Sequence, residues 1–128
     1  MVDTSKCPCA SDKHYDDCCR DFHDSKSIPK TAQELMRSRY SAYVKKNIPY
    51  LLETWHESSR PTAQELEANP EFRWIQLEVI ATEKGLEDDD TGIVHFKAQY
   101  KFQGNLGAME EKSNFVKENG RWLYTIGD

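Results

Sequence analysis

Long apolar runs and an excess of positive charge are both absent from this sequence. Of its 128 residues, 17 are lysine or arginine and 22 are aspartate or glutamate, so the net charge is −5. An acidic chain disfavours charge-driven binding to nucleic acid or anionic membranes. No stretch reaches the roughly 20 apolar residues that span a bilayer, and residues 1–6 lack the apolar core of a secretory signal. We therefore expect a cytoplasmic protein without a membrane span.

Recognisable catalytic motifs are absent as well. No Ser/His/Asp set, glycine-rich phosphate loop or paired-carboxylate spacing stands out, and we favour a protein that is not an enzyme. One enzymatic hypothesis remains, with His56 as general base and Arg39 orienting an anion. In the alternative, which we favour, His56 meets the dipole of a helix C-terminus and Arg39 pairs with Glu34 or Glu53.

Cysteine is absent after residue 19, and the cysteines before it are closely spaced. In a reducing cytosol such thiols stay available to metals, and four thiolates in one short loop can surround a tetrahedral Zn²⁺. A metal with four protein ligands has no position for an activated water, so we expect one structural zinc ion. The predicted ligands are Cys7, Cys9, Cys18 and Cys19.

Other uses of these cysteines fit less well. Disulfides within the close pairs would form strained small rings in the wrong compartment. A thioredoxin-like site needs Cys-x-x-Cys beside a βαβ unit, and iron–sulfur clusters usually have other spacings. His14 or His23 could replace a thiolate, but four cysteines already complete the shell.

The spacing Cys-x-Cys, eight residues, Cys-Cys resembles the SEC-C motif, a zinc-binding segment of the preprotein translocase motor and of many small bacterial proteins. Pro8, Ser11, Lys13 and Tyr15 also match the motif, whereas Ala10 stands where it usually has glycine. In the translocase the motif contacts a chaperone and the ribosome. The resemblance therefore implies a zinc knuckle with a protein partner.

Helix signals dominate the first half of the remaining chain. Residues 23–30 are polar and contain a proline, which predicts a linker. Thr31 and Thr62 each open a Thr-Ala-Gln-Glu capping box, and Pro49 can begin a helix between them. We expect three helices, the first reaching about residue 47 and the last ending before Pro70.

Alternating apolar residues dominate the second half. We expect the first strand to bury every second residue over 75–81 and the second strand to do so over 94–102. His95 then lies on the solvent side. Residues 84–90 and 104–107 predict turns.

A two-residue type I′ hairpin is predicted at Asn119-Gly120. Its register sets Phe115 opposite Tyr124 and Val116 opposite Leu123. The order of elements indicates an α+β protein with helices on one face of a curved sheet of four antiparallel strands.

The whole chain resembles the YchJ family, bacterial proteins with an N-terminal SEC-C motif and a body similar to nuclear transport factor 2. The knuckle, residues 35–43, 54–56 and 115–122, and the Trp74 strand carry the resemblance. It implies a cone of three helices packed on the curved sheet, and the polar linker predicts a boundary between this domain and the knuckle, although whether the two pack together cannot be read from the residues. The expected boundaries are a knuckle over 1–22, a linker over 23–30 and the domain over 31–128.

Such a cone can enclose a cavity, but aromatic residues at helix and strand spacing more often form a core, which is what we expect here. The residues expected near a cavity are Arg39, Tyr40, Tyr43, Trp55, His56, Trp74, Phe115, Trp122 and Tyr124.

Three functions follow from these features, and neither the partner nor the oligomeric state can be read from the residues. The leading hypothesis is a protein-interaction module organised by the zinc site. The alternative is small-molecule binding or catalysis in the cone. The third is RNA or ribosome contact through Tyr15 and Phe22, which three basic residues against five aspartates in residues 1–23 disfavour.

Overall fold

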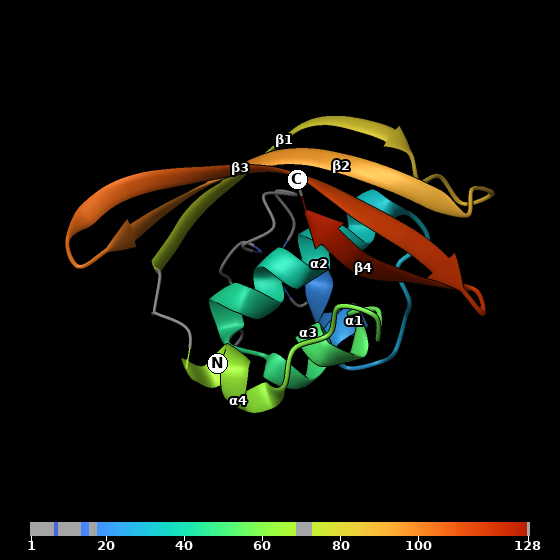
Figure 1. Ribbon diagram of the computed structural model, residues 1–128, viewed down its shortest axis with the longest axis horizontal. Coiled ribbons are helices and arrows are strands. Elements are labelled where there is room, and N and C mark those ends of the chain that lie inside the picture. The colour runs from blue at the N-terminus through green and yellow to red at the C-terminus, as the bar shows by residue number, and fades with distance from the viewer. Residues whose placement is uncertain (1–6, 8–13, 16–17, 69–72, 128) are drawn as a thin grey trace.

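A curved sheet wraps around one long helix in the computed structural model (Figure 1). The structure describes residues 7, 14–15, 18–68 and 73–127. Four antiparallel strands follow one another in sequence order across the sheet. They are β1 (Arg73–Lys84), β2 (Thr91–Phe102), β3 (Asn105–Glu118) and β4 (Arg121–Gly127).

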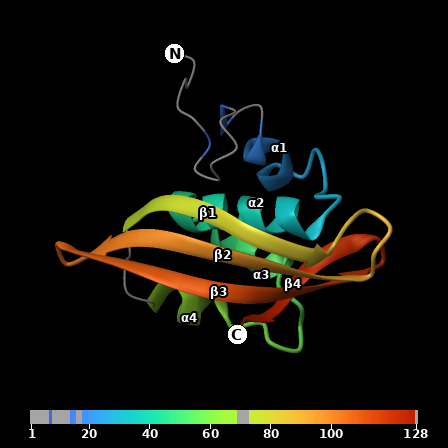
Figure 2. The same cartoon turned by 90° about the horizontal axis from the view of Figure 1, so that it is seen from above.

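The helices lie against the concave face of this sheet or beyond it, as the view from above shows (Figure 2). They are α1 (Cys19–His23), α2 (Ala32–Lys45), α3 (Ile48–Glu53) and α4 (Ala63–Ala68). The predicted α+β cone, with three helices in its body, is confirmed. The short α1 was not anticipated. No helix of the described residues is long and apolar enough to cross a membrane.

Capping residues set the starts of the helices as predicted. The hydroxyl of Thr31 accepts a hydrogen bond from the backbone N–H of Glu34 at 3.1 Å. Thr62 caps α4 in the same way at 3.1 Å. In α3, proline occupies the first turn, where its missing N–H costs nothing. Helix α2 ends at Lys46, which adopts the left-handed conformation with φ 58°.

The core forms between α2 and the inner face of β2. Val94, Phe96 and Ala98 are buried on the strand, and they pack in one cluster with Leu35 and Tyr40 of α2. The alternation predicted for this strand is therefore confirmed. The predicted hairpin is confirmed too, with Phe115 opposite Tyr124 and Val116 opposite Leu123.

The strict alternation predicted for the first strand is wrong. The pairing of β1 with β2 shifts register between Trp74 and Gln76 and again between Val79 and Ala81. Each shift is a β-bulge, which adds one residue and reverses the faces that follow it. As a result Ile75 is 49% exposed, while Trp74 packs against the core.

Close backbone approach fixes the start of α2 on the sheet. The N–H of Ala32 donates to the carbonyl of Gly85 at 2.9 Å. A Cβ on Gly92 would lie 2.5 Å from the Cα of Gly85, so a side chain does not fit there. The helix is thereby fixed near the β1–β2 turn at one end.

The two capping boxes allow a matched test of which helix, α2 or α4, contributes more to the stability of the fold. We expect Thr31→Ala to lower the free energy of unfolding by about 1 kcal/mol, the usual cost of a lost N-cap. Thr62→Ala should cost much less, because among the described side chains of α4 only Leu66 is partly buried. Urea unfolding of both variants measures the difference, and equal losses would contradict it.

Candidate functional site

Three cysteine thiols meet in the N-terminal part of the chain. The Sγ atoms of Cys7, Cys18 and Cys19 all lie within 4.8 Å of one another, and those of Cys18 and Cys19 are 3.9 Å apart. A tetrahedral zinc site with Zn–S bonds of ~2.3 Å has sulfur–sulfur edges of roughly 3.8 Å. The three thiols therefore fit three corners of a metal site. Cys9, the fourth ligand predicted from the sequence, lies outside the described residues.

Two of the three cysteines are buried and Cys18 is half-buried, and the cluster touches the body of the protein. Cys7 is 4% and Cys19 is 1% exposed. The hydroxyl of Ser41, on α2, lies 3.3 Å from the Sγ of Cys7. A hydroxyl at that distance can donate to a metal-bound thiolate, as groups around a metal site commonly do.

His23, the last residue of α1, fastens this region to α2. Its Nε2 lies 2.9 Å from the backbone carbonyl of Ser38, which can only accept, so Nε2 carries a proton and donates. Its Nδ1 lies 2.6 Å from the hydroxyl of Tyr15. Its ring also stands 4.7 Å from that of Tyr50 in α3. Both nitrogens are engaged, so His23 is not a metal ligand, and the described cluster includes neither it nor His14.

The described knuckle residues pack directly on the domain, a contact that the sequence left open. Phe22 packs against a cluster formed by Ala42, Tyr50 and Leu51. The ammonium of Lys45 lies 4.5 Å above the ring of Tyr15. His23, the first residue of the predicted linker, belongs to α1.

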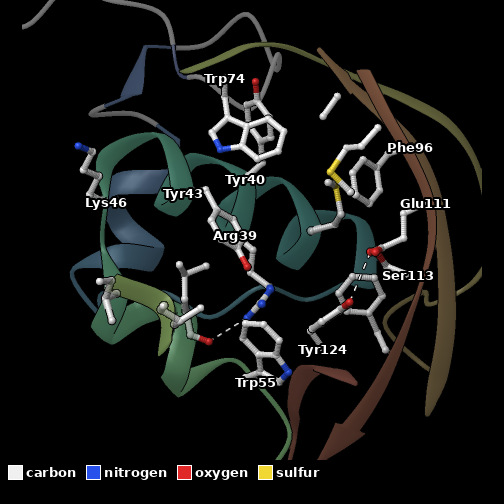
Figure 3. Close-up of a pocket in the computed structure, with 17 residues that line it drawn as sticks. Arg39, Tyr40, Tyr43, Lys46, Trp55, Trp74, Phe96, Glu111, Ser113 and Tyr124 are labelled. Atoms are coloured by element: carbon white, nitrogen blue, oxygen red, sulfur yellow. Dashed lines mark hydrogen bonds between the residues drawn. The ribbon is translucent and has the colours of Figure 1, made fainter. Parts of the chain in front are cut away.

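On the opposite side of α2 the cone contains a pocket of about 750 Å³, open rather than filled by side chains (Figure 3). Of the residues expected near a cavity, His56 and Trp122 do not line it. Trp122 is buried elsewhere and donates from Nε1 to the carbonyl of Lys30 at 3.0 Å. The lining residues are Met36, Arg39, Tyr40, Tyr43, Lys46, Ile48, Leu51, Trp55, Leu66, Trp74, Phe96, Ala98, Met109, Glu111, Ser113, Phe115 and Tyr124.

Arg39 reaches from α2 into the floor of this pocket (Figure 3). Its guanidinium lies 4.7 Å from the ring centre of Trp55 and 4.7 Å from that of Tyr124. Its Nη1 donates to the carbonyl of Leu51 at 2.9 Å and to the hydroxyl of Thr54 at 2.8 Å. Burial lowers the pKa of Arg39 from its ordinary value.

The expected pairing of Arg39 with Glu34 or Glu53 is wrong. Glu53 pairs instead with Arg121 at 3.0 Å, and Glu34 accepts from the backbone N–H of Lys30 at 3.2 Å. Both carboxylates therefore bond to partners at the protein surface and not to Arg39.

Glu111 supplies the pocket's carboxylate from the strand opposite α2. Glu111 lies on the inner face of the sheet, because it is directly opposite the inward-facing Phe96 of β2. The hydroxyls of Ser113 and Tyr124 both donate to its Oε2, the latter at 3.4 Å. Burial, with the Glu111 charge as the second cause, raises the pKa of Tyr124 to about 12.

His56 lies outside the pocket and has its own partners. Its Nε2 is 2.6 Å from Oε2 of Glu118, and its Nδ1 is 2.7 Å from the hydroxyl of Ser58. The structure therefore does not bring His56 together with Arg39 in one site.

Some lining residues escaped prediction because their signal lies in the strand alternation. Met109, Glu111 and Ser113 occupy every second position of β3 before Phe115, which was expected there, and they face the pocket as it does. Extending the Phe115 face of the hairpin backwards would have placed two polar residues inside the cone. Such polar residues on an inner face are the usual mark of a binding site.

Comparisons with known proteins agree with this arrangement. A family model described as YchJ, middle NTF2-like domain, matches residues 31–127. A UPF0225 protein of Streptomyces coelicolor is 39% identical over 125 residues, covering 98% of this chain and 96% of its own. One from Chromobacterium violaceum is 44% identical over 122 residues, covering 94% and 90%.

Two solved structures share the fold. A SEC-C motif-containing protein from Rhodopseudomonas palustris superposes with a TM-score of 0.84 at 30% identity, covering 95% of this chain and 96% of that one. Another from Psychrobacter arcticus has a TM-score of 0.79 at 27% identity, covering 98% and 84%.

The fold and the cysteine cluster define a small protein that joins a SEC-C motif able to hold a metal to an NTF2-like cone. The chain belongs to the YchJ family, whose middle-domain model spans nearly all of its body. The family resemblance predicted from the sequence is thereby confirmed.

The buried phenols predict how stability changes at high pH. Burial raises the pKa of Tyr40 to about 12, and Tyr124 is raised to about 12 as well. Because the unfolded phenols ionise near pH 10, this contribution to stability is complete below pH 10. It is lost as the pH rises from 10 to 12.

We therefore expect the free energy of unfolding to fall across this interval, and to fall less steeply in Tyr124→Phe. Urea unfolding at several pH values, with phenolate absorbance recorded on the folded protein, measures both effects. Complete phenol ionisation near pH 10 in the folded protein would contradict the expectation.

Proposed function

We propose that this protein is a zinc-stabilised receptor for a small, largely apolar molecule. The observation that carries the proposal is the open pocket of about 750 Å³ between α2 and the sheet. Ligand pockets commonly fall between about 300 and 1,000 Å³, with apolar walls and a few convergent polar groups. This pocket has that composition, with Arg39, Glu111 and Ser113 among aromatic and aliphatic side chains.

The pocket favours binding over catalysis. The only histidine expected to act as a base, His56, points to Glu118 and Ser58 instead. Arg39 and Glu111 are each held in place by hydrogen bonds to neighbouring groups. Polar groups fixed in this way suit recognition of a ligand. The alternative derived from the sequence, a small molecule in the cone, thus becomes the leading proposal.

We expect the metal site to stabilise the pocket through α2, because the knuckle and the pocket lie on opposite sides of this helix. We propose that Cys7, Cys9, Cys18 and Cys19 bind one Zn²⁺, in a cytoplasm that keeps the thiols reduced. With 3.6 residues per helical turn, Ser38 and Ser41 lie on one side of α2, and Met36, Arg39, Tyr40 and Tyr43 lie on the other. The knuckle contacts the first set, and the second set lines the pocket. The zinc would therefore hold the helix that forms one pocket wall.

A protein partner for the knuckle stays a prediction from the SEC-C resemblance. RNA contact through Tyr15 and Phe22 is disfavoured by the packing of both rings as well as by the charge of residues 1–23. Tyr15 bonds to His23 and lies under Lys45, and Phe22 packs against the α2–α3 cluster. Both rings are occupied with packing and are not presented for base stacking.

Removal of the metal should weaken the body as well as the knuckle. We expect purified protein to contain about one Zn²⁺ per chain, and chelation to lower the Tm of the cooperative transition by several degrees. Cys18→Ser should lose the zinc and show the same lower Tm without chelator. Ser58→Ala, a substitution away from the knuckle, should keep both the zinc and the Tm shift on chelation. An unchanged Tm after complete loss of zinc would contradict the support that we propose.

Filling the pocket should abolish binding of an apolar probe. Phenylnaphthylamine is a neutral aromatic molecule whose fluorescence rises in apolar surroundings, and we expect wild-type protein to bind it at one site. Met109→Trp replaces a thioether side chain by a larger indole ring in the pocket and should weaken binding about tenfold or more. Leu106→Trp, on the same strand at a side chain that is 74% exposed, should bind as wild type does. No binding by wild type, or equal binding by both variants, would overturn the proposal.

A further inference from the structure

Arg39 is a buried cation without a carboxylate partner. The residue is 5% exposed, and the ion pairs of the described residues do not include it. Its partners are neutral, namely the carbonyl of Leu51 and the hydroxyl of Thr54. Arginine stays protonated in proteins, so a full positive charge stands in the pocket floor.

Buried charges in proteins are normally paired, because neutral dipoles replace only part of the lost hydration. The rings of Trp55 and Tyr124, each 4.7 Å from the guanidinium carbon, compensate for part of this loss through cation–π attraction. The two ring centres are only 5.2 Å apart, so both rings lie on the same side of the guanidinium and do not enclose it between them. The hydrogen bonds that Arg39 makes among the described residues use Nη1, which leaves the edge formed by Nε and Nη2 for an anion. The edge is the side from which guanidinium binds carboxylates through paired hydrogen bonds.

The carboxylate of the lining differs from Arg39 in having its partners within the protein. Glu111 is the lining's single carboxylate, and the hydroxyls of Ser113 and Tyr124 already donate to it. The protein therefore satisfies the pocket's anion from its own strands, whereas the charge of Arg39 has no such counterpart.

The walls around Arg39 determine the rest of the ligand. Trp74 stands in edge contact with Tyr40 at 6.0 Å and with Tyr100 at 5.7 Å, and Figure 3 shows Trp74, Tyr40 and Phe96 on the side of the pocket away from Trp55. Met109 adds a polarisable thioether to the lining of the pocket. Aromatic edges and methionine sulfur favour flat, aromatic surfaces.

We propose that the pocket binds a flat aromatic molecule that bears one anionic group, and that Arg39 receives this group while the Trp74 wall holds the apolar part. This inference rests on the proposed function, because it assigns a ligand class to the same pocket. No part of the chemistry requires a covalent step.

A pair of probes that differ only in charge tests the ligand class. Anilinonaphthalene sulfonate has the same ring system as phenylnaphthylamine and adds one sulfonate. With wild-type, zinc-loaded protein, we expect the sulfonate probe to bind at least about tenfold more tightly than the neutral probe, the advantage of one charge-assisted contact. Competition by naphthoate, but not by naphthamide, should show that a carboxylate occupies the same position.

Variants at Arg39 locate the effect. Arg39→Lys keeps the charge and should keep most of the preference for the anionic probe. Arg39→Met removes the charge and should abolish the preference, while its retained binding of the neutral probe shows that the pocket is still formed. Glu111→Gln removes a like charge and should strengthen binding of the sulfonate probe alone.

The outcomes separate the two proposals. If neither probe binds wild-type protein, the proposed function and this inference both fail. If both probes bind equally well, or if Arg39→Met keeps the preference, the pocket is a receptor but the assigned ligand class is wrong. The wild-type comparison stands by itself if Arg39→Met does not fold, because it needs no variant.

Discussion

Helix α2 is packed on two opposite sides, and both candidate sites depend on this. On one side Ser38 and Ser41 meet His23 and Cys7 of the knuckle. On the other side Tyr40 and Arg39 extend toward the sheet and the pocket. A helix of 14 residues in isolation is marginally stable in water, and tertiary packing supplies most of its stability. The cysteine cluster and the curved sheet thus pack against the same helix from two sides.

Side chains of different sizes line the pocket on the inner face of the sheet. Ala98 on β2 and Ser113 on β3 are small, and Phe96 and Glu111 lie between them in the ladder. The large rings of Trp74, Trp55 and Tyr124 also line the pocket and come from β1, the segment after α3 and β4. The bulge beside Trp74 turns its ring inward. Aromatic side chains from several segments thus form much of the pocket wall without filling the space between α2 and the sheet.

Local patterns allowed most of the fold to be predicted. The capping boxes at Thr31 and Thr62 and the hairpin at Asn119-Gly120 depend on neighbouring residues alone, and each appears where it was expected. The β1 bulges were missed because they arise from pairing with β2, which a single strand does not encode.

In the candidate site, too, features set by neighbouring residues could be predicted, and features set by contacts between distant segments could not. Four closely spaced cysteines indicate a metal site through short-range spacing, and three of them converge in the described residues. The partners of Arg39 could not be predicted, because Trp55 and Tyr124 come from distant segments joined by the Trp55–Tyr124 bridge. The openness of the pocket depends on how all the elements pack together. It could not be inferred from aromatic spacing, which is the same in a filled core.

The shared helix has a thermodynamic consequence. When two ligands stabilise the same conformation of one element, each raises the affinity for the other by the same factor. If zinc at the knuckle and a molecule in the cone both favour the packed form of α2, an occupied cone retains its zinc more firmly against competing chelators. An empty cone would release zinc sooner, so the metal content of the protein would report on the supply of its ligand.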